Sequence, residues 1–257
     1  MPFITAAGHR LDTRWIEPRE GSGPTLVFLH EGLGSIEMWR DFPDRIARMT
    51  GCATLVYSRY GYGRSDPLTE GRKLDYLHRE ALDVLPAVLD ACAIHDPVLI
   101  GHSDGASIAL LLAGGGICPV RGAVVMAPHV FVEDETIAGI EKAKAAWTEG
   151  GLARALARYH DDAEGAFRGW HEAWLSPGFR AWNIEEYLHG IRCPLLAIQG
   201  VDDEYATLAQ IDAIESQVSG PFERLDLAEC RHTPWRDQPE RVAEAITRFV
   251  SGLRASD

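Results

Sequence analysis

One pentapeptide in the middle of the chain has residue types and spacing that suit nucleophilic catalysis. Residues 101–105 read Gly-His-Ser-Asp-Gly, directly after an apolar segment at 97–101 and before another at 103–113. A G-x-S-x-G sequence at a strand-to-helix turn places a serine hydroxyl on an exposed bend, because the two glycines allow close backbone approach. The amides that begin the following helix then face any oxyanion formed there. We therefore predict that Ser103 is a nucleophile.

A serine hydroxyl needs a base and an orienting carboxylate, and the downstream sequence offers both. The apolar segment 195–199 runs into three acidic residues at 202–204, and the segment 222–227 is soon followed by His232. Sites in parallel sheets lie past the carboxyl ends of the strands. We therefore predict that His232 is the general base and that Asp203 orients it. The two acidic neighbours of Asp203 remain alternatives for this role.

Short apolar segments alternate with helical ones along most of the chain. This alternation predicts an α/β fold with a mostly parallel central sheet flanked by helices. Segments at 3–6 and 11–15 are expected to add an antiparallel edge. The apolar composition of the other strands predicts that they are buried on both faces. The parallel strands are expected at 25–30, 53–58, 97–101, 123–127, 195–199 and 222–227, and the helices at 75–93, 103–113, 207–218 and from Pro239 onward.

The alternation stops at about residue 130 and resumes near residue 191. The segment 130–190 shows helical patterns only, which predicts an inserted helical cap, or lid, within a core formed by 1–129 and 191–257. It holds four of the seven tryptophans. An aromatic-rich insertion suits a lid over a pocket, and the helical spacing of Phe167, Trp170 and Trp174 suits packing onto the core equally well. The tryptophans that we expect to line a substrate pocket are Trp147, Trp170 and Trp174.

Five landmarks, taken in order, make the chain resemble an α/β-hydrolase-fold serine hydrolase of the esterase type, with a helical cap. The resemblance implies that Ser103 is the nucleophile, that His232 acts first as base and then as acid, and that Asp203 orients His232. It also implies an oxyanion hole formed by the backbone amides of Gly32 and Asp104, and no metal or organic cofactor. The landmarks are residues 29–34 (LHEGLG), 58–66 (SRYGYGRSD), the Ser103 turn, residues 200–203, and His232 followed by residues 238–240.

The sequence departs from the pattern of that family beside the expected site. Glu31 stands where a glycine is usual after the first histidine, and Arg231 where a glycine often precedes the catalytic histidine. Glu31 and Asp104 place two carboxylates near the nucleophile. This arrangement predicts either a subsite for a substrate ammonium group or hydrogen bonds from nearby backbone, Arg59 or Arg64.

The other histidines near the motifs are expected to have supporting roles. His129 follows the strand at 123–127 and is a candidate for lining the substrate pocket, with packing as the alternative. His30 and His102 match positions that support loop geometry in the resembling family. The histidines of the insertion lie among polar residues and are expected to be solvated: His160, His171 and His189.

Composition excludes several classes of partner. The chain has 25 Lys and Arg against 38 Asp and Glu, a net charge of −13, with no basic cluster. This charge predicts no binding to nucleic acid or to an anionic membrane. No apolar run is long enough to span a bilayer and no signal peptide is recognisable, so we expect a cytoplasmic protein. The five cysteines form no C-x-x-C pair, which argues against a zinc site.

These features predict a hydrolase that cleaves a small or medium carboxylic ester through an acyl-enzyme, with a small-molecule substrate as its partner. Three alternatives remain. The same site suits a thioester or a carbon–carbon bond. A cofactor-free dioxygenase would use the serine only to bind substrate. A binding protein of this fold would have no turnover, since fold alone does not decide function. The oligomeric state is not predicted.

Overall fold

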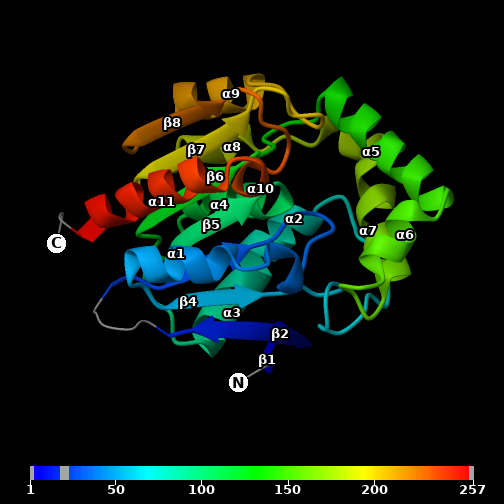
Figure 1. Ribbon diagram of the computed structural model, residues 1–257, viewed down its shortest axis with the longest axis horizontal. Helices are drawn as coiled ribbons and strands as arrows, with labels where there is room; N and C mark the ends of the chain where they lie inside the picture. Colours follow the sequence, from blue (N-terminus) through cyan, green and yellow to red (C-terminus); the bar gives the residue numbers. More distant parts are fainter. Residues whose placement is uncertain (1–2, 18–22, 255–257) are drawn as a thin grey trace.

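The computed structural model describes residues 3–17 and 23–254, which are built around one eight-stranded sheet (Figure 1). The strand order is β1-β2-β4-β3-β5-β6-β7-β8. Neighbours from β4 to β8 are parallel, whereas β1 and β2 form an antiparallel edge. This confirms the predicted mostly parallel α/β sheet. The strands are β1 (Phe3–Ala6), β2 (His9–Ile16), β3 (Leu26–Leu29), β4 (Thr54–Tyr57), β5 (Val98–His102), β6 (Gly122–Met126), β7 (Leu195–Gly200) and β8 (Phe222–Leu227).

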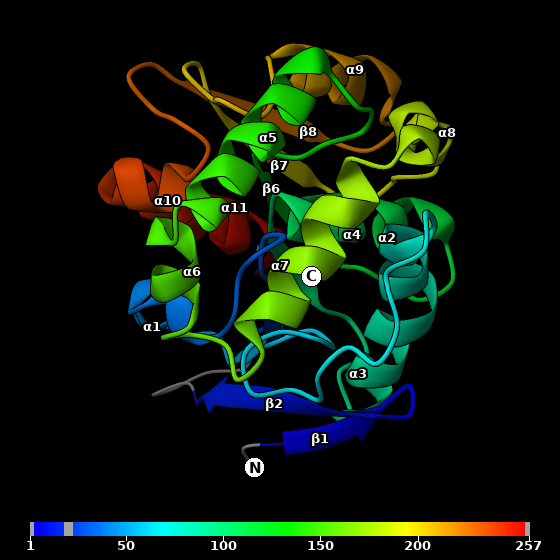
Figure 2. The ribbon, with the colours of Figure 1, turned by 90° about the vertical axis from the view of Figure 1, so that its right-hand side faces the viewer.

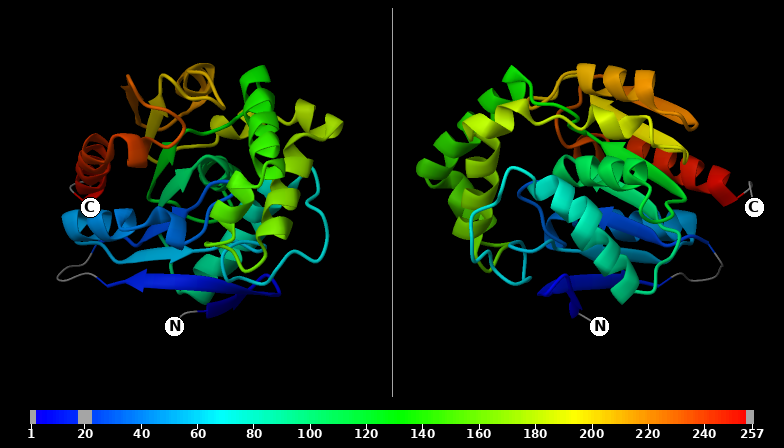
Figure 3. Two further views of the ribbon diagram at one scale, coloured as in Figure 1. Left: turned by 45° about the vertical axis from the view of Figure 1, so that its right-hand side comes forward. Right: turned by 180° about the vertical axis from the view of Figure 1, so that it is seen from behind.

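Helices cover both faces of the sheet, as predicted. Helices α1 (Phe42–Thr50) and α11 (Pro239–Arg254) pack together on the face nearer the viewer in Figure 1. Helices α3 (Leu85–Ala91) and α4 (Asp104–Gly115) cover the other face, seen in the right-hand panel of Figure 3, and α9 (Ala209–Gln217) packs beside β8. The short elements of the core are η1 (Glu37–Trp39), α2 (Tyr76–Arg79), the π-helix η2 (Glu80–Val84) and α10 (Pro234–Asp237).

The helix predicted at 75–93 is divided into α2, η2 and α3. Pro86 lies at the start of α3 and has no N–H to bond the carbonyl four residues back. The turn before it widens instead, and the Leu85 N–H donates to the Glu80 carbonyl, five residues earlier. This i→i+5 hydrogen bond makes the segment Glu80–Val84 a π-turn between two α-helical segments.

The expectation that all six strands are buried on both faces is wrong for β8. Only Leu227 of this strand is fully buried, because β8 is the edge of the sheet. Arg224 projects from it into a group of acidic side chains, and charge on an edge strand opposes pairing with another chain. The ion-pair partners of Arg224 are Asp212, Glu215 and Asp226.

Residues 130–190, here called the cap segment, connect β6 to β7. Figures 1 and 2 show α5, α6 and α7 lying together beyond one end of the sheet. The described residues of the segment form helices and one isolated bridge, between Phe131 and Asn183. The helices are α5 (Asp134–Thr148), α6 (Gly151–Leu156), α7 (Ala163–Trp174), η3 (Pro177–Ala181) and α8 (Glu185–Leu188).

Candidate active site

Ser103 lies at the sharp turn between β5 and α4. Its φ of +53° and ψ of −118° are strained for a residue with a side chain. A Cβ on Gly105 would lie 2.0 Å from the Leu29 carbonyl oxygen, and one on Gly101 would lie 2.3 Å from the Gly105 carbonyl oxygen. The Ser103 N–H donates to the Met126 carbonyl oxygen on β6 at 2.9 Å. The two glycines therefore make the turn possible, and the turn holds Ser103 at the carboxyl end of β5.

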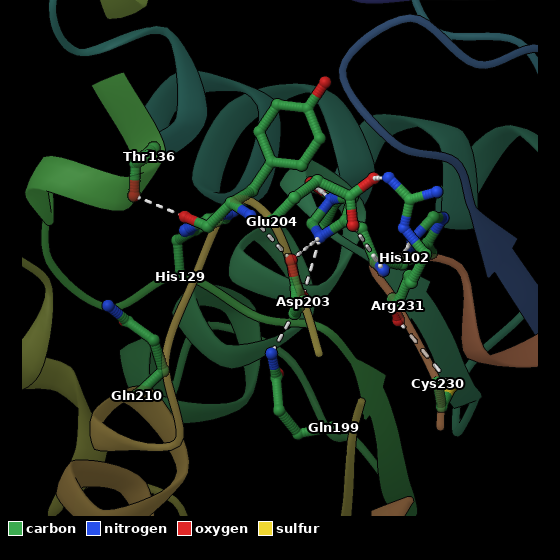
Figure 4. Close-up of polar contacts among 12 residues, drawn as sticks. His102, His129, Thr136, Gln199, Asp203, Glu204, Gln210, Cys230 and Arg231 are labelled. Carbon is green, nitrogen blue, oxygen red and sulfur yellow. Dashed lines mark hydrogen bonds and ion pairs between the residues drawn. The ribbon is translucent and has the colours of Figure 1, made fainter. Parts of the chain in front are cut away.

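Three side chains from different strand ends form a continuous hydrogen-bonded chain. His232 Nε2 lies 3.0 Å from Ser103 Oγ, and His232 Nδ1 lies 2.9 Å from each carboxylate oxygen of Asp203. The Asp203 carboxylate also accepts hydrogen bonds from the Tyr205 N–H and from Gln199 Nε2, both at 2.8 Å, as Figure 4 shows for Gln199. Because Asp203 accepts the Nδ1 proton, Nε2 is left as the acceptor for the Ser103 hydroxyl.

The acidic neighbours of Asp203 have other contacts. Asp202 is exposed and faces solvent. Glu204 accepts hydrogen bonds from the His232 N–H at 3.2 Å and from Arg231 at 2.9 Å (Figure 4). The structure thus places Asp203, and neither neighbour, against the imidazole. Arg231, which stands where a glycine is usual, joins the loop after β8 to the loop after β7 through its ion pair with Glu204.

The charges around the imidazole set its protonation. Burial lowers the pKa of His232, but Asp203, Glu204 and Glu31 act in the opposite direction, and the net pKa is raised above its ordinary value of 6.5. Burial raises the pKa of Asp203, and the adjacent His232 outweighs this effect, so that the net pKa is lowered. The pair therefore favours a carboxylate beside an imidazole that binds a proton readily.

The two residues predicted to supply oxyanion donors lie after β3 and at the start of α4. Asp104 is the first residue of α4, so its N–H is one of the amides that lack an intrahelical acceptor. Gly32 follows β3 and lies under Trp170 of α7. A Cβ on Gly32 would lie 2.2 Å from Trp170 Nε1, so only glycine lets the indole approach this loop. The cap segment therefore contacts the loop expected to hold the oxyanion.

The two carboxylates near the nucleophile have partners within the protein. Asp104 is 1% exposed and accepts hydrogen bonds from Tyr76 Oη at 2.8 Å and from Arg59 Nη2 at 3.5 Å. The Glu31 carboxylate lies 3.4 Å from His102 Nδ1. Of the two expectations, hydrogen bonding to the protein describes Asp104, with Tyr76 as a donor that the sequence did not reveal.

His129, one of the predicted pocket residues, lies beside the hydrogen-bonded chain, and Trp174, another, lies beside His129. The ring of His129 is 5.9 Å from that of His232 and 5.2 Å from that of Trp174. Burial, aided by nearby His232, lowers the pKa of His129 to about 3, so its ring is neutral. Trp147 instead stacks on Phe167 at 4.2 Å, and its placement is explained by packing within the cap segment.

The expectation that His160 is solvated is wrong. Its ring is 6% exposed, Nδ1 accepts a hydrogen bond from the Gly63 N–H at 2.9 Å, and Nε2 donates to the Leu33 carbonyl at 3.0 Å. Its neighbours in sequence are polar, and nothing local signals that the side chain turns into the core. His189 is exposed, as expected, and the ring of His171 stacks on Phe167.

His30 and His102 hold backbone near the site. His30 Nδ1 donates to the Glu31 carbonyl at 2.7 Å, and its Nε2 accepts the Arg59 N–H at 3.0 Å. His102 Nε2 donates to the His232 carbonyl at 2.7 Å. Another neighbour, Tyr205, was not predicted; its ring lies 4.6 Å from that of His232 and covers the imidazole.

Two kinds of feature are absent from residues 3–17 and 23–254. In these ranges no three His, Cys, Asp or Glu side chains gather as metal ligands would. The helices within the same ranges are all too short or too polar to cross a bilayer.

Comparisons with known proteins place this geometry in context. A model of the alpha/beta hydrolase family matches residues 26–245. Zearalenone hydrolase of Cladophialophora bantiana is 30% identical over 101 residues, 39% of this chain and 38% of that one. The 2-succinyl-6-hydroxy-2,4-cyclohexadiene-1-carboxylate synthase of Salmonella paratyphi C is 30% identical over 118 residues, 46% and 44% of the two chains. Both alignments span less than half of the relative's length. The enol-lactonase of Burkholderia xenovorans LB400 shares the fold, with a TM-score of 0.77, 19% identity, and coverage of 97% and 100%.

Proposed function

This chain belongs to the alpha/beta hydrolase family, and from that premise we propose that it hydrolyses a small or medium carboxylic ester through an acyl-enzyme on Ser103. The observation that carries the proposal is the hydrogen-bonded chain from Asp203 through His232 to the Ser103 hydroxyl. That chain supplies a nucleophile, a base in the correct tautomer and a buried anion to stabilise the imidazolium.

In the first half-reaction, Ser103 Oγ attacks the ester carbonyl while its proton passes to His232 Nε2. The carbonyl oxygen becomes an oxyanion, which the N–H groups of Gly32 and Asp104 receive. Each such donor contributes about 3 to 4 kcal/mol to transition-state stabilisation. His232 then returns the proton to the alkoxide, which leaves as an alcohol and gives the acyl-enzyme.

In the second half-reaction, water replaces the alcohol. His232 takes a proton from the water, the hydroxide adds to the acyl carbonyl, and the same amides receive the oxyanion. Collapse returns the proton to Ser103 and releases the carboxylic acid. No cofactor is required for either step, because no electrons are exchanged and each proton that His232 accepts is passed on within the same half-reaction.

The surroundings of Ser103 support an apolar or aromatic substrate group. Ser103 is 7% exposed, Trp170 of the cap segment lies against Gly32, and Trp174 lies beside a neutral His129. Apolar side chains with a few polar atoms are typical of small-molecule pockets. We propose that Trp170, Trp174 and His129 contact the substrate, and that the cap segment excludes water from the acyl-enzyme.

Covalent labelling with a fluorophosphonate tests the nucleophile. We expect stoichiometric labelling of the wild-type protein, its loss in Ser103→Ala, and its persistence in Ser251→Ala, which removes an exposed hydroxyl on α11. A wild-type protein that takes up no label would favour a binding protein.

The bond cleaved is tested with a panel of substrates. We expect p-nitrophenyl esters to be hydrolysed faster than acyl-CoA thioesters and than vinylogous diketones, whose cleavage breaks a carbon–carbon bond. Faster cleavage of either of the latter would reassign the reaction on the same residues. Oxygen uptake with a heteroaromatic substrate that persists in Ser103→Ala would indicate the dioxygenase instead.

A further inference from the structure

Arg59 is a buried cation that contacts both halves of the expected oxyanion hole. Its Nη2 donates to the Glu31 carbonyl at 2.9 Å and reaches the His30 carbonyl at 3.4 Å and the Asp104 carboxylate at 3.5 Å. Its side chain has no measurable exposure. We propose that Arg59 is a positioning residue, which aims the Gly32 N–H and the Asp104 N–H at one point. This inference rests on the proposed function.

The Glu31–Gly32 peptide carries the first expected donor, the Gly32 N–H. The Glu31 carbonyl accepts three hydrogen bonds, from His30 Nδ1 at 2.7 Å, Arg59 Nη2 at 2.9 Å and the Gly34 N–H at 3.1 Å, and only Arg59 reaches it from outside this loop. A trans peptide is planar, and its N–H points opposite to its C=O. A carbonyl fixed on the Arg59 side therefore directs the Gly32 N–H to the other side of the loop. Loss of the Arg59 donor would leave only the two donors of the loop itself on this carbonyl, and the direction of the Gly32 N–H would be less firmly fixed.

Asp104 carries the other expected donor, its backbone N–H. Its carboxylate is held by Arg59 and by Tyr76 Oη, and Tyr76 Oη in turn accepts a hydrogen bond from Trp174 Nε1 at 2.8 Å. Because Trp174 belongs to α7, the cap segment is joined by side chains to the first residue of α4. One cation thus links the loop after β3 to the turn after β5.

The energetics disfavour a purely stabilising role for this pair. Arg59 Nε and Nη1 and Asp104 Oδ1 are buried and have no hydrogen-bond partner among the described residues. Removing charges from water costs several kcal/mol per ion, which such incomplete partnering does not recover. An apolar pair of similar volume would serve stability as well or better. Arg59 also lies over the Tyr62 ring, 4.9 Å from its centroid, but the hydrogen bonds that its guanidinium makes are those to the two donor-bearing segments.

A second buried ion pair provides a matched control. Arg72 and Glu80 have side chains that are 4% and 6% exposed, with their nearest atoms 3.4 Å apart, and Arg72 Nη2 donates to the Tyr60 carbonyl at 2.8 Å. The chemistry is the same, a guanidinium between a carboxylate and a backbone carbonyl. The Tyr60 carbonyl lies outside the loop that holds Gly32, and the Glu80 carboxylate lies outside α4.

The test compares Arg59→Lys with Arg72→Lys. Lysine keeps the charge but lacks the fork that reaches a carbonyl and a carboxylate together. With p-nitrophenyl butyrate, we expect Arg59→Lys to lower kcat about 100-fold, the scale for one oxyanion donor, with KM changed less than about threefold. The inhibition constant of 1,1,1-trifluorooctan-2-one, which forms an oxyanion on serine, should rise by a similar factor. That of octan-2-one, which forms no stable adduct, should not change.

The outcomes separate this inference from the proposed function. A wild-type protein that neither turns over an ester nor binds the trifluoroketone would reject the proposed function. If the wild type is active but Arg59→Lys and Arg72→Lys have the same kcat and the same trifluoroketone affinity, only the positioning role is rejected. If Arg59→Lys does not fold, the double variant Arg59→Met with Asp104→Asn removes both charges, and we expect it to fold and show the same losses. A double variant that folds with full kcat would likewise overturn the role.

Discussion

Strands β3 to β6 of the core are buried along their whole length, whereas α5 and α6 of the cap segment bury only Thr136, Gly139, Ile140 and Leu156. In the core, the backbone itself fixes the residues that follow each strand, because sheet hydrogen bonds set the register. The cap segment has no such ladder in its described residues. Strand ends therefore position Ser103, Asp203 and His232, whereas side-chain contacts position the cap segment above them.

The cap segment is hydrogen-bonded to the core at several places, and three side chains of the segment make such bonds near the candidate site. His160 bridges Gly63 and Leu33, Trp174 donates to Tyr76, and Thr136 Oγ1 donates to the Tyr205 carbonyl at 2.7 Å, as Figure 4 shows. Each joins the cap segment to a loop next to the candidate site. These contacts hold the cap segment beside the candidate site.

The largest effect is expected in the core, at Asp203. Changing Asp203→Asn should lower kcat about 10⁴-fold, because an amide favours the wrong imidazole tautomer. Steady-state kinetics with p-nitrophenyl butyrate measures this loss, and Asp202→Asn, at an exposed neighbour, should retain activity. A loss of less than tenfold in Asp203→Asn would contradict the assignment of the orienting carboxylate.

The next effect is expected where the cap segment meets the core. His160→Ala leaves the Gly63 N–H and the Leu33 carbonyl without their partner, so we expect the free energy of unfolding to fall by about 3 kcal/mol. Urea denaturation measures the change. His189→Ala, an exposed histidine of the same segment, should change stability by less than about 0.5 kcal/mol. Equal stabilities of the two variants would show that the buried bridge is unimportant.

A smaller effect is expected within the cap segment itself. Trp147→Ala removes the stacked contact with Phe167 and should cost about 1 kcal/mol of unfolding free energy, with kcat nearly unchanged. Thermal unfolding and the kinetics of short and long acyl esters measure the two quantities. A large fall in kcat would mean that Trp147 reaches the reacting groups, contrary to its placement here.

The smallest effect is a change in pH dependence. His232 must be neutral to accept a proton, and its pKa is raised, so kcat/KM should fall as the pH drops through a midpoint above 6.5. Glu204→Gln removes one negative charge that favours the protonated ring and should lower this midpoint by a fraction of a pH unit. Glu186→Gln, on an exposed residue of α8, is the control. A midpoint that rises in Glu204→Gln would contradict this account of the imidazole.

Much of the fold followed from local patterns. Alternating apolar segments predicted the parallel strands, and the order of the motifs along the chain predicted which strand precedes each candidate site residue. The spacing of Gly101, Ser103 and Gly105 predicted the turn. These features are local, since a strand or a tight turn depends on residues only a few positions apart. The division of the helix at 75–93 was not predicted, although Pro86 was a visible signal for it.

The sequence by itself therefore determined which strands lead into the candidate site at their carboxyl ends and which residue types follow them. Only the tertiary structure decided which side chains meet: Asp203 rather than its neighbours at His232, Arg59 with Asp104, and His160 in the core. The physical reason is range. Ser103 and His232 lie 129 positions apart, and Arg59 and Asp104 lie 45 apart. Periodicity reports whether a residue faces the interior, but a hydrogen bond also needs a partner that only the packed chain brings within reach.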